Sequence, residues 1–178
     1  MILGLDILLK LVKEIKLVEN LAERELNHPE GTGFDLRAGI LYELDGPGYL
    51  DIDSRDTSPT KKIATYVEGN SQKILIRKQT SYLVQTIERV NMPKSLVALV
   101  KPRTTLFRSG VSLDTAIVSP GYEGELTFGV YARNFDFTLE MGARIAHIIF
   151  ADILGDATLY KGQWQGGRVS TSGIEKQI

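Results

Sequence analysis

The feature that most constrains the fold is a succession of short apolar runs that begins after His28-Pro29. These runs are rich in Ile, Val, Thr, Tyr and Phe, and clusters of Gly, Pro, Asn and Asp separate them. The expected strands are residues 33–44, 73–76, 81–90, 96–101, 111–118, 126–132 and 143–150. Because β-branched and aromatic residues favour strands while Gly and Pro favour turns, the pattern predicts a mainly β fold.

Two segments depart from this strand pattern. Residues 6–19 place apolar side chains at helical spacing with lysines on the other face, which predicts an amphipathic helix with Asp6 as its N-cap. Residues 45–70 hold most of a polar connection that contains Pro and Gly. A connection of this length is expected to carry minor structure of its own.

Composition restricts the kind of partner. A chain of 178 residues, with 43% apolar and 24% charged residues, is typical of a single soluble globular domain. The net charge of −1 provides no global field for nucleic acid, so an anion site must be built from a few local cations. The absence of Cys excludes disulfides and thiolate zinc sites. Charged residues interrupt the apolar start, so we expect no signal peptide or membrane span, and a cytoplasmic location by default.

Residues 101–110 concentrate groups that bind phosphate. Three cations, Lys101, Arg103 and Arg108, share this stretch with the adjacent hydroxyls of Thr104 and Thr105. Arginine forks bind phosphate oxygens bidentately, and hydroxyls with backbone N–H groups at a helix start supply further donors. The segment therefore predicts a triphosphate site, with a solvated turn as the alternative.

Residues 119–124 form a Gly- and Pro-containing turn between two predicted strands and place Tyr122 on it. Main-chain groups of such a hairpin can read a pyrimidine edge while the tyrosine ring packs against a deoxyribose. The alternative is a hairpin turn with no ligand, in which Pro and Gly serve only the turn geometry.

Five segments in order resemble one superfamily. Residues 33–39 resemble the first dUTPase motif, 103–108 the second, 115–124 the third and 142–150 the fourth, and residues 160–173 resemble the closing segment of dCTP deaminases. The likeness to the dUTPase and dCTP deaminase superfamily spans nearly the whole chain. It implies one distorted β-barrel or jelly-roll-like domain over residues 1–178 with a short N-terminal helix. It also implies a homotrimer with sites between subunits, and a flexible lid or tail at 160–178.

The resemblance also implies roles for individual residues. The substrate-contacting positions of the family are here Arg103, Thr104, Thr105, Thr115, Ala116, Ile117, Tyr122, His147, Gln163 and Gln165. The first three contact phosphates, the next three belong to the hairpin whose backbone reads the pyrimidine, and the glutamines belong to the lid. Tyr122 matches the aromatic residue that excludes a ribose 2′-hydroxyl. His147 replaces a Gln; it can donate to phosphate or serve as a structural histidine.

Departures from the family concern its catalytic carboxylates. Gly129 stands where the deaminases carry the Glu that relays protons, and Ser119 stands where dUTPases carry the Asp that orients the attacking water. A serine cannot act as that carboxylate. The expected catalytic residues are therefore Arg108, which matches an Arg used by deaminases, Ser119, and Glu125 as the replacement carboxylate.

Three acidic residues are near enough in sequence to replace the missing group: Asp114, Glu123 and Glu125. On an alternating strand, Glu125 shares its face with Gly129 and could reach the space that the missing Glu leaves. A solvent-facing charge is the alternative for each. In the first motif Asp35 and Arg37 share a strand face and are expected to pair; by resemblance Asp35 either organises a magnesium-water shell or forms a structural ion pair.

The leading hypothesis is hydrolysis of dUTP, or a related dNTP, to the monophosphate and pyrophosphate. Mg²⁺ is expected to bind through the substrate phosphates and not through a metal site of the protein. The enzymatic alternative is deamination of dCTP, which the length, the N-terminal helix and the tail favour. A catalytically weak, nucleotide-binding regulatory protein is the third hypothesis, because both expected carboxylates are replaced.

Overall fold

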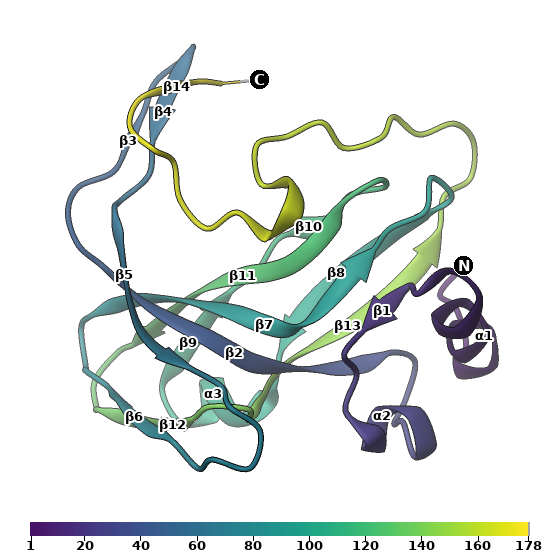
Figure 1. Cartoon of the computed structure of the whole chain (residues 1–178), viewed down its shortest axis with the longest axis horizontal. Coiled ribbons are helices and arrows are strands. Elements are labelled where there is room, and N and C mark those ends of the chain that lie inside the picture. Colours follow the sequence, from purple (N-terminus) through teal and green to yellow (C-terminus); the bar gives the residue numbers. More distant parts are fainter. Residues whose placement is uncertain (178) are drawn as a thin grey trace.

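The computed structural model describes residues 1–177 and consists mainly of antiparallel strands (Figure 1). The elements, in chain order, are α1 (Leu5–Ile15), β1 (Val18–Glu19), α2 (Glu23–Asn27), β2 (Phe34–Leu44), β3 (Tyr49–Leu50), β4 (Ser54–Asp56), β5 (Thr60–Thr65), β6 (Lys73–Ile76), β7 (Ser81–Asn91), β8 (Leu96–Pro102), α3 (Thr104–Arg108), β9 (Val111–Asp114), β10 (Ile117–Val118), β11 (Glu123–Ala132), β12 (Phe137–Glu140), β13 (Arg144–Asp152), η1 (Gln165–Gly167) and β14 (Glu175–Lys176). The mainly β prediction is confirmed.

One curled sheet contains most of the strands. Its path runs β10-β8-β13-β2-β7-β11-β9, with β1 added to β7 and β5 to β2. The two ends of this path, β9 and β10, are consecutive in the chain and only Thr115 and Ala116 separate them. The two edges of the sheet must therefore approach each other, which gives the barrel-like shape visible in Figure 1.

The predicted strand at 111–118 is wrong as a single element. β9 pairs with β11 through Asp114 opposite Gly129, whereas β10 pairs with β8 through Ile117 opposite Leu99. The chain changes partner between these pairings, so the ladder is interrupted although the residues keep strand-forming composition. The break places Thr115 and Ala116 at the meeting point of the two sheet edges.

The N-terminal helix is confirmed but is shorter than expected. It ends before Lys16, whose left-handed φ of 55° closes the helix while its N–H donates to the Leu11 carbonyl. Gly4 precedes the first turn, so Asp6 lies inside that turn and does not cap it. The next residues then pair with β7 as β1, because Val18 lies opposite Val90.

The long connection at 45–70 carries minor structure, as expected. It contains β3, β4 and β5, and β14 of the tail adds to β4 in a small separate sheet. The end of the tail, residues 171–177, therefore runs beside this connection, whereas the earlier part of the tail passes above β10 and β11 in Figure 1. Thr171 reinforces the contact because its hydroxyl donates to Asp56 over 2.6 Å.

Alternation along β11 separates the core from the outer face of the sheet. Leu126, Phe128 and Val130 are buried in the core, whereas Glu125 and Gly129 lie on the partly exposed face. The shared face predicted for Glu125 and Gly129 is thus confirmed. No helix within residues 1–177 is long and apolar enough to cross a membrane.

Candidate active site

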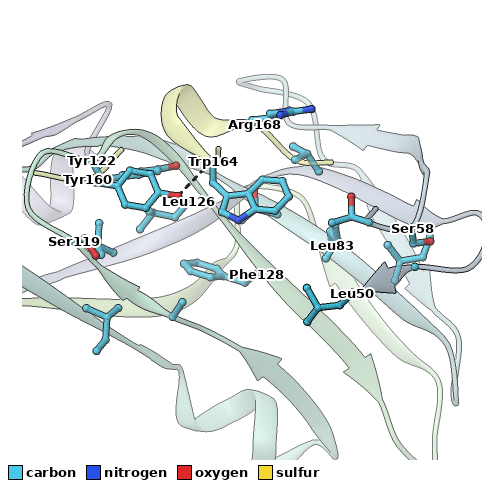
Figure 2. A pocket seen from close by; sticks show the side chains of 18 of the residues that line it. Leu50, Ser58, Leu83, Ser119, Tyr122, Leu126, Phe128, Tyr160, Trp164 and Arg168 are labelled. Atoms are coloured by element: carbon cyan, nitrogen blue, oxygen red, sulfur yellow. Dashed lines mark hydrogen bonds between the residues drawn. The ribbon is translucent and has the colours of Figure 1, made fainter. Parts of the chain in front are cut away.

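A cavity of about 710 Å³ lies between the tail, the β3–β4 hairpin and the strands β7, β10 and β11 (Figure 2). Ala116, Ile117, Ser119 and Tyr122 line it, and they belong to the predicted third motif. Residues of β3, of β11 and of the tail also line it: Tyr49, Leu50, Leu126, Phe128, Tyr160, Trp164 and Arg168. An apolar cavity of this size with a few polar groups is typical of a small-molecule site.

Tyr122 is held rigidly at the cavity wall. Its hydroxyl donates to the Glu125 carbonyl over 2.6 Å, and its ring meets Tyr160 edge-on with centroids 5.5 Å apart. Burial, followed by the nearby Tyr160 and Glu125, raises the pKa of Tyr122 to about 12. The side chain therefore stays neutral at ordinary pH and offers the cavity a flat aromatic surface, not an acid–base group.

The tail contacts the third-motif turn directly. Gln165 donates to the Gly121 carbonyl over 3.0 Å and accepts from the Glu123 N–H over 3.2 Å. Gly124 permits this approach, because a Cβ at that position would come within 2.4 Å of the Gly167 nitrogen. The other predicted lid residue, Gln163, donates instead to the Lys176 carbonyl within the tail. Gln165 therefore joins the tail to the third-motif turn, whereas Gln163 joins two parts of the tail.

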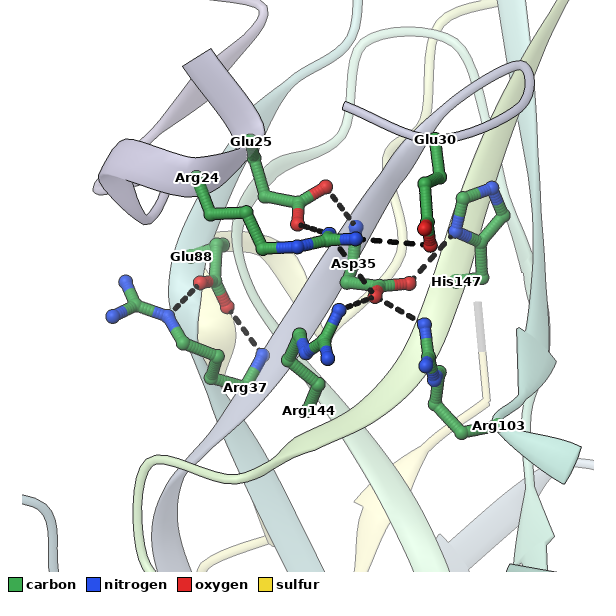
Figure 3. A network of polar contacts seen from close by, with 9 residues as sticks. All are labelled: Arg24, Glu25, Glu30, Asp35, Arg37, Glu88, Arg103, Arg144 and His147. Atoms are coloured by element: carbon green, nitrogen blue, oxygen red, sulfur yellow. Dashed lines mark hydrogen bonds and ion pairs between the residues drawn. The ribbon is translucent and has the colours of Figure 1, made fainter. Parts of the chain in front are cut away.

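A second group of predicted residues surrounds Asp35, away from the cavity lining (Figure 3). The Asp35 carboxylate accepts hydrogen bonds from the guanidinium groups of Arg103 and Arg144, the latter over 2.8 Å. It also contacts Nδ1 of His147 over 2.9 Å. Burial alone would raise the pKa of this carboxyl, but hydrogen bonds from His147 and Arg103 and the Arg103 charge lower the pKa to about 2. Asp35 therefore remains ionised at any ordinary pH.

The expected pairing of Asp35 with Arg37 is wrong. Arg37 instead binds Glu88 on β7, with its side-chain Nε 2.6 Å from one carboxylate oxygen and its backbone N–H 2.7 Å from the other. Two residues apart on a strand share a face, but each finds a closer partner on an adjacent strand. Both members of the predicted pair are thus satisfied by long-range contacts.

The remaining phosphate-segment residues lie on α3. Arg103 precedes the helix, and its backbone N–H donates to the Ile145 carbonyl over 2.9 Å, which ties the helix start to β13. Thr104 and Thr105 occupy the first turn and are exposed, and Arg108 lies exposed in the last turn. Thr115, expected at the base-reading hairpin, donates its hydroxyl to the Val100 carbonyl and so fixes that hairpin to β8.

The three candidate carboxylates have different surroundings. Glu125 lies against Gly167 of the tail and 3.9 Å from Arg89, and Glu123 is exposed at the start of β11. Asp114 faces Gly129 across the β9–β11 pair; a Cβ at Gly129 would lie 3.3 Å from an Asp114 carboxylate oxygen. Asp114 is therefore the carboxylate next to the space that Gly129 leaves open.

Sequence reasoning did not assign two cations of the Asp35 cluster. Arg144 lies three residues before His147 on β13, and a register shift brings both to Asp35. Arg24 of α2 approaches Asp35 to 3.9 Å and is held by Glu25 and Glu30. Arg144 lay in the fourth-motif segment and could have been noticed there; the contact of Arg24 depends on how α2 packs.

The chain matches the family described as dCTP deaminase-like over residues 2–153 and belongs to that family. Its members are enzymes of nucleotide metabolism, and the matched region contains the curled sheet, the third motif and the Asp35 cluster. The match thus covers both groups of candidate residues but not the tail.

Similar proteins carry two activity names. A dCTP deaminase of Caldivirga maquilingensis is 29% identical over 170 residues, covering 94% of this chain and 93% of the relative. A deoxyuridine 5′-triphosphate nucleotidohydrolase of Methanocaldococcus jannaschii is 28% identical over 151 residues, covering 83% and 92%. The crystal structure of a dCTP deaminase from Agrobacterium tumefaciens superposes with a TM-score of 0.65 at 16% identity over 84% of this chain. The chain spans about half of that protein, 47%, and the likeness shows the shared fold.

Proposed function

We propose that the chain hydrolyses dUTP to dUMP and pyrophosphate. The observation that carries this proposal is Gly129, which leaves β11 without the glutamate on which the resemblance places deamination. The proposed phosphate-binding segment keeps Arg103, Thr104 and Thr105, which would hold the triphosphate during hydrolysis. The nucleotidohydrolase from M. jannaschii is a relative with the proposed activity in its name.

In this proposal the cavity takes the deoxynucleoside and the Asp35 cluster takes the phosphates. The backbone at Ala116 and Ile117 reads the pyrimidine, and the Tyr122 ring packs against the deoxyribose. Arg103 and His147 do not line the cavity of the same chain. This separation supports a homotrimer in which the cluster of one subunit faces the cavity of another, with the tail closing over the substrate.

Magnesium enters the proposal as part of the substrate. Within residues 1–177 no group of three or more His, Asp or Glu side chains could hold a metal ion. Both Asp35 oxygens already contact nitrogens of Arg103, Arg144 or His147, so this carboxylate is not placed as a free oxygen ligand. In the proposal Mg²⁺ is carried by the substrate phosphates, where it would neutralise charge.

The proposal is tested by incubating the full chain with each dNTP and Mg²⁺ and resolving all nucleotide products. We expect dUMP and pyrophosphate from dUTP in equal amounts. Absence of pyrophosphate release from dUTP, in protein shown to bind the nucleotide, would remove the proposal and leave the binding assignment.

Deamination of dCTP is the second candidate, and Asp114 favours it. Its carboxylate lies beside Gly129, so a shorter acid on β9 stands next to the position where deaminases carry a glutamate on β11. The C. maquilingensis relative, named dCTP deaminase, aligns over nearly the full length. Ammonia release from dCTP that disappears in Asp114→Asn would establish this candidate.

Replacing Ser119 with aspartate tests how water is activated. Ser119 lines the cavity, so Ser119→Asp places a carboxylate at its wall. If the natural chain is slow, we expect dUTP turnover to rise by at least about tenfold, since a positioned base accelerates proton removal. A fast natural enzyme that gains nothing would indicate another carboxylate, and single alanine variants of Asp114, Glu123 and Glu125 would identify it.

A further inference from the structure

The cluster around Asp35 is organised on one buried carboxylate. The Asp35 side chain is 3% exposed, whereas those of Arg103, Arg144 and His147 are 32%, 37% and 29% exposed. Each of the three side chains thus turns one nitrogen toward the same acid (Figure 3), while part of it remains accessible. Arg144 and His147 lie on β13 and Arg103 directly precedes α3, so the shared acceptor aligns side chains from two parts of the fold.

The arginines of this cluster have different carboxylate partners. Arg103 and Arg144 both meet the Asp35 carboxylate, whereas Arg24 is bonded to two carboxylates, with Glu25 2.6 Å and Glu30 2.9 Å from its guanidinium nitrogens. The three arginines and three carboxylates sum to zero formal charge, so the cluster offers an anion its donors and not a net charge. The partly exposed guanidinium groups of Arg103 and Arg144 are planar donor forks held in place, and such forks suit an anion with several oxygens.

We propose that Asp35 is a positioning residue, which holds Arg103, Arg144 and His147 in the arrangement that takes up the triphosphate. The inference rests on the proposed function only in taking a triphosphate as the ligand. Asp35 itself does not touch that ligand, since the side chains of Arg103, Arg144 and His147 occupy both of its oxygens. Its role is to reduce the conformational freedom that these side chains would lose on binding.

Asp35→Asn separates positioning from simple charge balance, because the two roles predict opposite signs. If Asp35 only balanced charge, Asp35→Asn would remove a negative charge near the anion, and anion affinity would rise. If Asp35 positions the three side chains, Asp35→Asn would remove an acceptor, because an amide offers one oxygen where the carboxylate offers two. The side chains would then be less well aligned, and anion affinity would fall. We expect the variant to bind inorganic tripolyphosphate at least about tenfold more weakly, with Asp35→Glu recovering part of the loss.

The matched control is Glu88→Gln. Glu88 is fully buried, forms an ion pair with Arg37 and accepts from the Arg37 backbone N–H, but no hydrogen bond or ion pair joins it to Arg103, Arg144 or His147. Glu88→Gln therefore measures how much stability is lost when a buried carboxylate of the same sheet is neutralised. We expect Glu88→Gln to lower the melting temperature and leave tripolyphosphate affinity within about twofold.

Calorimetric titration with tripolyphosphate, below the melting temperature of each variant, reads out the result without requiring turnover. With dUTP as substrate, the loss in Asp35→Asn should appear in KM more than in kcat. Unchanged or tighter tripolyphosphate binding in folded Asp35→Asn, or no binding by the natural chain, would overturn the inference. If Asp35→Asn does not fold, Asp35→Glu decides: tripolyphosphate binding weaker than that of the natural chain supports the inference, and unchanged or tighter binding overturns it. Failure to cleave dUTP with tripolyphosphate binding retained would contradict only the proposed function.

Discussion

Replacing Arg103 with alanine is expected to weaken dUTP binding by about 1.5 to 3 kcal/mol, the range for hydrogen bonds to charged groups. That range corresponds to about 10- to 150-fold in the dissociation constant. Arg103 is the cation that joins the Asp35 cluster to the start of α3, so its loss removes one donor fork from the phosphate site. The domain should stay folded, because Arg144 and His147 still contact the Asp35 carboxylate.

Affinity for a non-hydrolysable dUTP analogue, measured by titration calorimetry, checks this prediction. Arg77→Ala is the control, since Arg77 is 66% exposed and makes a surface ion pair with Asp136 over 3.3 Å. It removes the same charge from the chain outside the cluster and should change affinity by less than about twofold. A folded Arg103→Ala protein with the affinity of the natural chain would show that residues 101–110 do not bind phosphate.

Deleting residues 160–178 is expected to lower turnover by about a hundredfold while leaving a folded domain. The deletion removes Trp164 and Arg168 from the cavity wall and Gln165 from the third-motif turn. A bound substrate would then be more open to water. The fold should persist, because the tail donates one short strand to a separate three-stranded sheet and leaves the curled sheet complete.

Two point variants distinguish closure of the site from support of the tail. Gln165→Ala removes the contacts with Gly121 and Glu123, whereas Gln163→Ala removes a bond to Lys176 within the tail. We expect Gln165→Ala to reproduce part of the turnover loss and Gln163→Ala to have a smaller effect. A truncated protein that melts much earlier than the full chain would show that the tail is structural, and full turnover would exclude a lid.

Local sequence patterns predicted the longer strands but not their pairing, and they did not predict β1, β5 or β12. Strands β2, β6, β7, β8, β11 and β13 overlap the expected runs because alternation and turn residues are local signals. The break between β9 and β10 could not be predicted, since it arises when the chain exchanges β11 for β8 as partner. The short helix α2 lacks an apolar pattern long enough to indicate a helix.

The candidate site was predictable as a set of residues but not as a geometry. The third-motif residues Ala116, Ser119 and Tyr122 share one cavity, as their closeness in sequence suggests. Asp35 instead meets residues more than sixty positions away, and the local rule that paired it with Arg37 had no access to those contacts. The competing partners decide the pairing, and only the folded chain brings them together.

The most direct test of the central claim is phosphorus-31 NMR of dUTP incubated with the full chain and Mg²⁺, with ammonia from dCTP measured in parallel. The proposal predicts that the three triphosphate resonances of dUTP are replaced by those of dUMP and pyrophosphate, without ammonia release from dCTP. Ammonia release from dCTP with the dUTP resonances unchanged would contradict the proposal. It would identify the chain as a deaminase that works with Gly129 in place of the family's glutamate.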